Sequence, residues 1–394
     1  MQDGLIAAGV CRKGLWMLEN VSPRFDPLRL EERSLVGDAM PFAAGGQPYY
    51  IVAPRYIRTS AGVKALYLLC HCLNRAGQEA FMVVYPDRPN PDRTKLDLLI
   101  PRLSSEQMQK HVKAGVSPII VYPETIGGNP LRGRSIVRYV LNFPGLLAGD
   151  RVYQKNEMVF GYSSVLAEAG GAPGRVLFIP TSDTKLFSPG PPQTRLGSCF
   201  YAMKYQLVHQ GALFPVTQGS VEITRDRPDS QQPEEIAALF RRSELFYAYE
   251  NTALAPEAAL CLCPTVFLPN PWLTDGIALR ELGTDGFAWG TDPAEIARAK
   301  ATVHRARERY LATYAAFWDQ LADFIGITQA RAAQDAASSG FPRQMMNFLR
   351  WGPRFESSLF MARRAGEVLR HEGPLAALRK SGRMLVRAGR HLAS

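Results

Sequence analysis

Two glutamates, Glu250 and Glu257, lie seven positions apart around a polar turn that contains Asn251 and Thr252. A carboxylate pair of this kind can orient hydroxyl groups or perform acid–base chemistry. Both residues follow a predicted strand, at the edge where open α/β sheets bind ligands. A glutamate in the first turns of a helix can instead simply compensate the helix dipole, an effect worth about 0.3–1 kcal/mol. Both interpretations stay open for each glutamate.

The segment around these glutamates predicts a strand, a turn, a helix and a second strand. Residues 243–249 form a short aromatic-rich run, and Asn251 or Thr252 could cap a helix that continues to about Cys261. Pro264 ends that helix, and Thr265–Leu268 has the pattern of a buried strand. The pattern therefore predicts a parallel α/β unit that presents the glutamates at its ligand-binding edge.

The segment resembles the donor-sugar motif of retaining GT-B glycosyltransferases of the family-4 type. Residues 257–266, EAALCLCPTV, match the second half of that motif. The two glutamates are one position closer than usual, so strict counting places Tyr249 at the first glutamate position, and Leu262 replaces the usual glycine. The resemblance implies that Glu257 holds the nucleotide ribose and that Glu250 orients the sugar. It is closest to bacterial polysaccharide enzymes, including rhamnan-type rhamnosyltransferases.

A basic residue follows the first predicted strand of the second half. Lys204 comes after the strand pattern of residues 198–203, where the family has a residue that pairs with the donor diphosphate. An ammonium group acts there as a point charge on phosphate. The alternative is a solvated lysine after a strand, and Met203 stands where the family usually has an arginine.

The first half opens with a predicted βαβ unit. Residues 49–54 and 80–85 are strand patterns, and Val63–Arg75 is a helix that ends at Gly77. The small-residue turn at 58–62 resembles the family's turn toward the acceptor and the donor diphosphate. Gly62 would allow close backbone approach, and the helix amides would face an anion.

A second candidate site follows the strand pattern at residues 117–122. Glu124 opens a Gly- and Pro-rich loop there, which is a usual place for an active site in α/β enzymes. Arg132 and Arg134 follow, and we interpret them as solvated charges of a crossover loop. If the enzyme inverts configuration, Glu124 is the first candidate for the base; if it retains, the family mechanism is front-face displacement without a protein nucleophile.

The remaining patterns complete both halves. We predict a helix at Ser135–Asn142, strands at Glu157–Tyr162 and Arg175–Ile179, and a helix that begins at Ser163 and Ser164. The segment 293–325 predicts a long, interrupted helix that returns to the first domain, as in GT-B proteins.

The boundary between the halves is predicted near residue 190. Residues 179–189, IPTSDTKLFSP, resemble the segment that ends the first domain of the family, and Gly190-Pro191-Pro192 provides a stiff linker. We therefore expect an extension at 1–48, an acceptor domain at 49–190, a nucleotide-sugar domain at 191–329 and a tail at 330–394.

Composition sets the remaining limits. A chain of 394 residues that is 46% hydrophobic can bury globular cores in two or three domains. No run approaches the ~18 apolar residues of a membrane-spanning helix, and the first twenty residues do not have the pattern of a signal peptide. Six scattered cysteines are expected to be buried free thiols rather than zinc ligands, which favours a reducing cytoplasm.

The net charge of +10 is concentrated in the tail. Residues 330–394 carry twelve Lys and Arg against four Asp and Glu, so the rest of the chain is close to neutral. A body-wide nucleic-acid surface is therefore not expected. Residues 355–370 and 374–392 predict Arg-rich amphipathic helices, which are typical of membrane-surface elements. The alternative is a pair of solvated helices docked on the body.

Together these patterns predict an α/β protein of the GT-B type with two Rossmann-like domains facing a cleft. The expected function is transfer of a sugar from a dTDP-, UDP- or GDP-sugar to a glycan or lipid-linked acceptor, with neither a cofactor nor a metal, in the cytoplasm or on the inner face of the membrane. Two alternatives remain: a catalytically inactive assembly partner docked on the membrane, and a sugar-nucleotide epimerase. The epimerase is ranked low because the six histidines do not obviously supply its acid–base groups.

Overall fold

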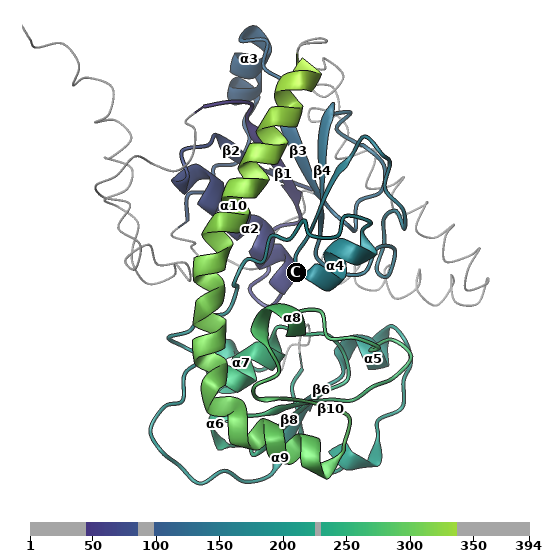
Figure 1. The fold of residues 1–394 in the computed structure, drawn as a ribbon, viewed down its shortest axis with the longest axis vertical. Helices are drawn as coiled ribbons and strands as arrows, with labels where there is room; N and C mark the ends of the chain where they lie inside the picture. The colour runs from purple at the N-terminus through teal and green to yellow at the C-terminus, as the bar shows by residue number, and fades with distance from the viewer. Residues whose placement is uncertain (1–44, 86–97, 225–229, 337–394) are drawn as a thin grey trace, which may run out of the picture.

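The computed structural model describes residues 45–85, 98–224 and 230–336. They form two α/β domains, one above the other in Figure 1, and helix α10 (Ala306–Ala336) runs along both. The predicted extension at residues 1–48 and the predicted tail at residues 330–394 lie almost wholly outside the described residues. Among the described residues, no helix is long and apolar enough to cross a membrane.

The first domain is built on a five-stranded sheet in which every strand pair is parallel. The strand order is β2-β1-β3-β4-β5. The strands are β1 (Tyr49–Ala53), β2 (Ala80–Val84), β3 (Ile119–Pro123), β4 (Ser135–Val140) and β5 (Met158–Gly161). The helices of this domain are α2 (Ala61–Arg75), α3 (Ser105–Lys113) and α4 (Ser164–Ala169).

The second domain repeats the arrangement, with parallel strands in the order β10-β9-β8-β6-β7. The strands are β6 (Ser198–Tyr201), β7 (Val221–Glu222), β8 (Leu245–Ala248), β9 (Thr265–Phe267) and β10 (Phe287–Trp289). The helices are α5 (Met203–Leu207), α6 (Pro233–Arg242), α7 (Leu254–Leu260), α8 (Leu279–Leu282) and α9 (Pro293–Thr302), with short 3-10 turns at Pro215–Thr217 and Val303–Arg305. Two parallel sheets confirm the predicted α/β class with two Rossmann-like domains.

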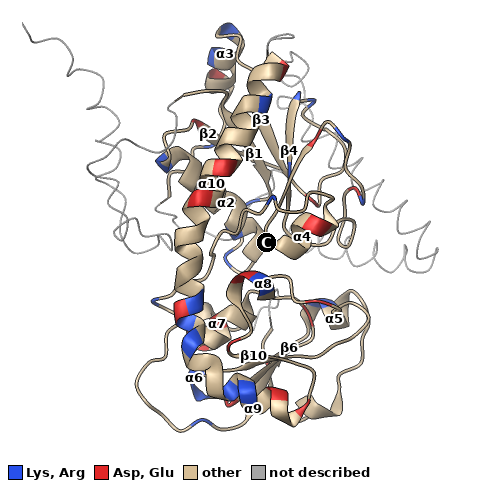
Figure 2. Cartoon of the chain, viewed as in Figure 1, with Lys and Arg blue, Asp and Glu red and all other residues tan. Residues whose placement is uncertain are grey.

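Helix α10 joins the two hydrophobic cores. Its first turns contribute Tyr310 to the core of the second domain, and Phe317, Leu321 and Phe324 are fully buried in the core of the first. The 3-10 turn at residues 303–305 separates it from α9, which is the predicted interruption of the long helix. Figure 2 marks both basic and acidic residues along α9 and α10, in keeping with a body that is close to neutral.

The helix predicted at Ser135–Asn142 is wrong, because this segment is the strand β4. All six residues of the strand are buried between β3 and β5, and three of them are β-branched. A short run that is buried on both faces has no alternation, so its periodicity cannot distinguish a strand from a helix. The strand predicted at Arg175–Ile179 is also wrong: the segment makes one isolated bridge, between Gly161 and Val176.

Helix α2 begins two residues earlier than predicted. Ser60 has extended backbone angles and its side chain accepts a weak hydrogen bond from Val63 N, so Ala61 and Gly62 belong to the first helical turn rather than to the loop. Gly77 follows the helix with a φ of 77°, the left-handed conformation expected of a glycine at that position.

Five cysteines lie in the described part of the chain and are free and buried: Cys70, Cys72, Cys199, Cys261 and Cys263. This confirms the predicted buried thiols at those positions, and Cys11 lies outside the described residues. Burial raises the pKa of the Cys261 thiol to about 12, so it stays protonated and packs as a small apolar side chain.

Candidate functional site

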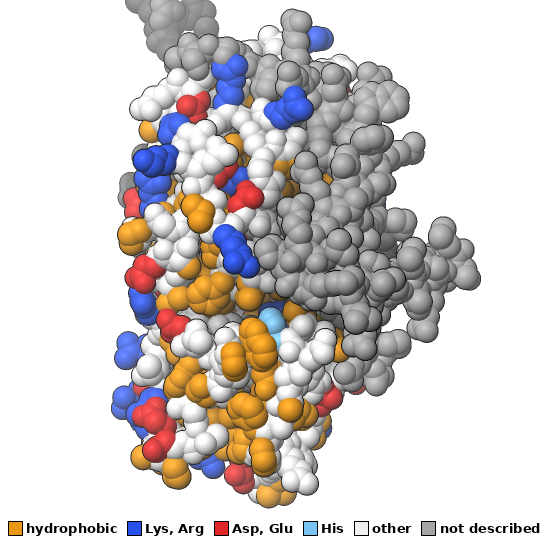
Figure 3. Space-filling view, turned by 90° about the vertical axis from the view of Figure 1, so that its right-hand side faces the viewer, with side chains coloured by type: hydrophobic (Ala, Val, Ile, Leu, Met, Phe, Trp, Pro, Cys, Tyr) orange, Lys and Arg blue, Asp and Glu red, His pale blue; other side chains and the backbone are white. Residues whose placement is uncertain are grey.

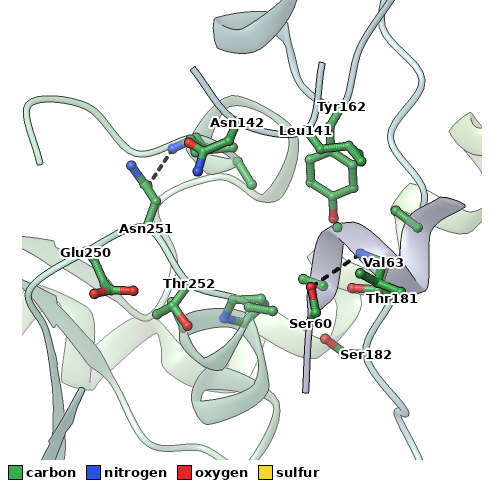
Figure 4. A pocket seen from close by; sticks show the side chains of 18 of the residues that line it. Ser60, Val63, Leu141, Asn142, Tyr162, Thr181, Ser182, Glu250, Asn251 and Thr252 are labelled. Atoms are coloured by element: carbon green, nitrogen blue, oxygen red, sulfur yellow. Dashed lines mark hydrogen bonds between the residues drawn. The ribbon is translucent and has the colours of Figure 1, made fainter. Parts of the chain in front are cut away.

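A cavity of about 460 Å³ lies between the two domains. The first domain contributes the start of α2 and the segments that follow β3 and β4, and the second contributes the segments that follow β6, β8 and β9. These segments leave the carboxyl ends of parallel strands, which is where this class of sheet binds its ligands. Figure 4 shows side chains from both domains facing one another across the cavity.

Six of the seven predicted site residues line this cavity, and the seventh does not. The six are Gly62, Glu124, Lys204, Glu250, Asn251 and Thr252. The first and the last of them are 190 positions apart in the sequence, and the two domains bring them together across the cavity. Glu257 is not among the lining residues.

Glu250 and Lys204 form an ion pair on the second-domain wall. Lys204 Nζ lies 3.3 Å from Glu250 Oε1, and the Glu250 side chain is 9% exposed. Glu250 Oε2 accepts hydrogen bonds from the backbone N–H groups of Lys204 (2.5 Å) and Tyr205 (3.0 Å), at the start of α5. The carboxylate therefore fixes the backbone that carries Lys204, and its buried Oε1 faces the Lys204 ammonium without a hydrogen bond to any described residue.

Glu124 is the carboxylate of the first-domain wall. It follows β3, is 4% exposed, and its Oε2 accepts a hydrogen bond of 3.0 Å from Leu141 N, at the end of β4. Burial raises the pKa of Glu124 to about 7, although the Leu141 N–H and the charge of Lys204 both act to lower it. A carboxyl group with a pKa near neutrality is suited to accept a proton at physiological pH.

Asn251 connects the polar turn to the chain segment between β9 and β10. Asn251 Nδ2 donates to Asp275 O (2.9 Å), and its Oδ1 accepts from Ile277 N (2.9 Å). Thr252 Oγ1 accepts from Leu254 N at 3.2 Å, but α7 begins at Leu254 after Ala253, and no side chain caps it. The alternatives for the cap are therefore resolved: Thr252 makes a local turn contact, and Asn251 holds a neighbouring loop.

Glu257 lies on α7, 3% exposed, and pairs with a lysine of the first domain. Lys64 Nζ on α2 is 3.7 Å from Glu257 Oε1, and the lysine side chain is 15% exposed. The predicted ribose-binding carboxylate thus makes a buried ion pair across the domain interface. Gly62, two residues before Lys64, does face the cavity; a Cβ there would meet only the Leu141 side chain, at 3.7–3.8 Å.

The pattern of the sequence did not reveal a group of hydroxyl-bearing residues at the other end of the cavity. Figure 4 shows Ser60, Tyr162, Thr181 and Ser182 gathered beside the start of α2. Tyr310 from α10 also lines the cavity, and its hydroxyl accepts a hydrogen bond of 2.8 Å from Ser182 N. Serine, threonine and tyrosine carry no spacing signal, so only the fold could bring them together.

Helix α8 reaches from the second domain to the first beside this cavity. Glu281 Oε1 accepts hydrogen bonds from the Ser164 N–H (2.7 Å) and from the Ser164 hydroxyl (2.6 Å). Arg280 pairs with Glu168 at 2.5 Å on the neighbouring turn of α4. Since Leu279 and Leu282 of α8 line the cavity, these contacts hold part of its wall in place.

Leu262 shows why the resembling motif has a glycine at this position. Its φ is 59°, in the left-handed region that β-carbon sterics disfavour for residues other than glycine. The turn between α7 and β9 therefore has at Leu262 a backbone conformation that glycine adopts more readily.

Histidine does not line this cavity in any part of the chain that the structure describes. His71 Nδ1 accepts from Leu99 N in the first domain, His111 Nδ1 and Tyr50 Oη lie 2.6 Å apart, and His209 stacks on Trp272. These histidines therefore offer no support for the epimerase alternative.

Comparison with known proteins gives similarity at the level of three-dimensional structure alone. No family model and no curated protein matches the chain. AviGT4, a glycosyltransferase involved in avilamycin A biosynthesis, is 14% identical over 71% of this chain and 98% of its own, with a TM-score of 0.41. A glycosyltransferase from Rickettsia africae ESF-5 is 10% identical over 80% and 99%, with a TM-score of 0.35. CalG4, the calicheamicin glycosyltransferase, is 14% identical over 74% and 99%, with a TM-score of 0.31.

Proposed function

We propose that this chain is a glycosyltransferase that takes a sugar from a nucleotide-sugar donor bound in the cavity between its two domains. The observation that carries the proposal is the convergence of Glu124, Lys204 and Glu250 on that one cavity, at the carboxyl ends of strands from both parallel sheets. Glu124 faces the space from the acceptor side, and Lys204 and Glu250 face it from the donor side. The resemblance of residues 243–269 to a donor-sugar motif supports the same assignment.

The donor diphosphate is assigned to the neighbourhood of Lys204 and the first turn of α2. Lys204 supplies a positive charge that Glu250 holds in position, and Ser60 and residues 61–63 of α2 line the opposite wall. The N-terminal end of a helix favours an anion, and the first turn of α2 contains no acidic residue that would compensate it. This arrangement would stabilise the charge that develops on the departing diphosphate.

Glu124 is the proposed base. As the acceptor oxygen bonds to the anomeric carbon, the bond from that carbon to the diphosphate breaks, its electron pair leaves with the nucleotide, and Glu124 takes the acceptor's proton. Burial and a pKa near 7 suit the carboxylate to this step. The product would have inverted configuration. The family resemblance favours retention by front-face displacement, in which the leaving phosphate takes the proton instead.

The anomeric configuration of the product separates these two routes. Release of nucleoside diphosphate from dTDP-, UDP- and GDP-sugars identifies the donor, and nuclear magnetic resonance of the first sugar product gives its configuration. The inverting route predicts an inverted product and a loss of at least about 100-fold in kcat for Glu124→Gln. A retained product with an active Glu124→Gln enzyme would leave the transferase assignment intact and remove Glu124 from its proposed role.

The finer assignments rest on the resemblance to bacterial polysaccharide enzymes. We propose a glycan or lipid-linked saccharide as acceptor, a cell-surface polysaccharide as product and a deoxyhexose on dTDP as the first donor to test. Glu257 is proposed to hold the ribose, in which case the ribose hydroxyls would displace the Lys64 ammonium from its present ion pair.

A catalytically inactive assembly partner is the second candidate. The observation that favours it is the buried Lys64–Glu257 ion pair, which occupies the carboxylate that the resembling enzymes use for the donor. Donor hydrolysis separates the candidates, because an inactive partner releases no nucleoside diphosphate from any donor.

A further inference from the structure

The second domain carries an exposed apolar surface that the proposed reaction does not use. We define it by residues 207–221 together with Trp272 in the loop after β9. Its exposed members are Leu207, Val208, Leu213, Val216, Val221 and Trp272, each between 39% and 52% exposed. Figure 3 shows hydrophobic side chains gathered on the second domain, in the lower half of that view.

Aromatic contacts join the two parts of this surface. Tyr205 is in edge contact with Trp272, at 5.8 Å between ring centroids, and with Phe214 at 6.3 Å. His209 stacks on Trp272 with centroids 4.6 Å apart and planes at 12°. Trp272 is thus held in one orientation while 42% of it stays exposed. The part of the surface around Trp272 is therefore held in place by the fold.

The surface is also free of charge along the chain. Between Lys204 and Glu222 the sequence contains no Lys, Arg, Asp or Glu. A soluble protein seldom exposes several large apolar side chains together without a partner. Leucine and tryptophan are among the side chains that proteins insert into the boundary between headgroups and acyl chains, where tryptophan presents both an apolar ring and a polar N–H.

The charge of the C-terminal part of the chain indicates which partner covers this surface. Residues 330–394 hold twelve Lys and Arg against four Asp and Glu. Basic residues near an anionic leaflet are attracted to it, and stable attachment generally needs a second, apolar contribution. The uncharged surface supplies the apolar contribution and the basic segment supplies the electrostatic one.

From this complementarity we infer that the surface defined by Leu207–Val221 and Trp272 docks on an anionic lipid bilayer. The surface begins at Leu207, on the same short helix α5 as Lys204, and Lys204 lines the cavity. Docking there places the cavity close to the lipid headgroups, where a lipid-linked acceptor would be presented. The inference stands independently of the transferase reaction, because it concerns binding to a membrane surface.

The test is cosedimentation of the full chain with two kinds of vesicle. One is phosphatidylcholine alone, and the other is an anionic mixture in which about one lipid in three is phosphatidylglycerol. The apolar surface is changed by Leu207→Gln with Leu213→Gln. The matched control is Leu196→Gln with Leu311→Gln, two leucines that are 75% and 41% exposed and lie outside the surface. Leu196 precedes β6, so it lies at the edge of the sheet opposite to α5, which follows that strand. Leu311 lies on α10.

We expect the wild type and the control to bind the anionic vesicles and the surface variant to bind them at least tenfold more weakly. Weak binding of all forms to phosphatidylcholine alone is also expected, since the basic segment then has no anionic partner. Two outcomes would overturn the inference. In the first, the surface variant binds the anionic vesicles as tightly as the wild type does. In the second, the wild type is a dimer and the surface variant is a monomer with unchanged vesicle binding, which would make a second copy of the chain the partner of this surface.

Discussion

Lys204 and Glu250 approach to 3.3 Å on the second-domain wall of the cavity, and they come from the carboxyl ends of the neighbouring strands β6 and β8. The same carboxylate accepts hydrogen bonds from the backbone N–H groups of Lys204 and Tyr205. Glu250 therefore has two roles that substitutions can separate: it holds the start of α5, and it sets the charge beside the lysine.

Glu250→Ala is expected to destabilise the protein more than Glu250→Gln. Alanine leaves the N–H groups of Lys204 and Tyr205 without their acceptor, which costs about 1–3 kcal/mol for buried donors. Glutamine retains an oxygen that can accept from both. The free energy of unfolding from urea titration measures the difference, and equal losses in the two variants would show that these hydrogen bonds do not hold α5.

Glu124 is expected to make stability depend on pH. Its pKa in the folded protein is about 7, above the 4.5 of an unperturbed glutamate, so the folded state binds the proton more tightly than the unfolded state. The protonated carboxyl stabilises the fold fully below about pH 4.5, and this contribution is lost as the pH rises to about 7, by about 3 kcal/mol in total.

Glu124→Gln removes this titration. The wild type should therefore lose stability relative to the variant between pH 4.5 and 7, as measured by urea unfolding at a series of pH values. The same titration predicts that the transfer rate rises through about pH 7 if Glu124 is the base. If the free energy of unfolding of the two proteins changed with pH in the same way, the Glu124 carboxyl would not be buried as it is in the structure.

Gly149→Ala is expected to displace the backbone that carries Glu124. Gly149 has a φ of 82°, and a Cβ there would lie 1.9 Å from the carbonyl oxygen of Glu124. Gly171→Ala is the matched control, since its φ is 77° and a Cβ there meets nothing within 4 Å. The control should lose about 1–2 kcal/mol from backbone strain alone. Gly149→Ala should lose more in urea unfolding, and equal losses would contradict the close approach to Glu124.

The Lys64–Glu257 pair is expected to couple the two domains energetically. In a double-mutant cycle with Lys64→Met and Glu257→Gln, contacting partners that are 15% and 4% exposed should give a coupling of about 0.5–3 kcal/mol. The exposed pair Lys110–Glu106, at 64% and 82%, is the control and should give less than about 0.5 kcal/mol. Coupling of the same small size in both cycles would mean that the interdomain pair contributes no more than a surface contact.

Much of the fold could be predicted from the sequence because its strands and helices carry strong local signals. Apolar strand runs, the cap Ser163 and the helix-ending Gly77 are local features, and each determined an element correctly. The prediction for strand β4 was wrong because its side chains are buried on both faces. They include the cation Arg138, which the sequence alone would place on a surface. The terminal nitrogens of Arg138 pair with groups that only the fold brings together, among them Glu157 at 2.7 Å and Ile126 O at 2.5 Å.

The position of Glu124, Lys204 and Glu250 at the cavity was predictable, because each of these charged residues follows a strand. Parallel strands place such residues at one edge, so the sequence position alone indicates the cavity. The partner of Glu257 was not predictable, because Lys64 belongs to the other domain and meets it only when the two domains pack together. The cluster of hydroxyl-bearing residues around Tyr162 and Ser182 could not be predicted for the same reason.

Calorimetric titration of the full chain with dTDP, UDP and GDP tests the central claim most directly. The variant is Lys204→Met, and the control is Lys110→Met, which changes a lysine of α3 that is 64% exposed. The account predicts that one nucleotide binds the wild type and the control equally, and that Lys204→Met binds it at least tenfold more weakly, a loss of about 1.4 kcal/mol. Absence of binding to all three nucleotides, or binding that Lys204→Met leaves unchanged, would contradict the assignment of this cavity as the donor site.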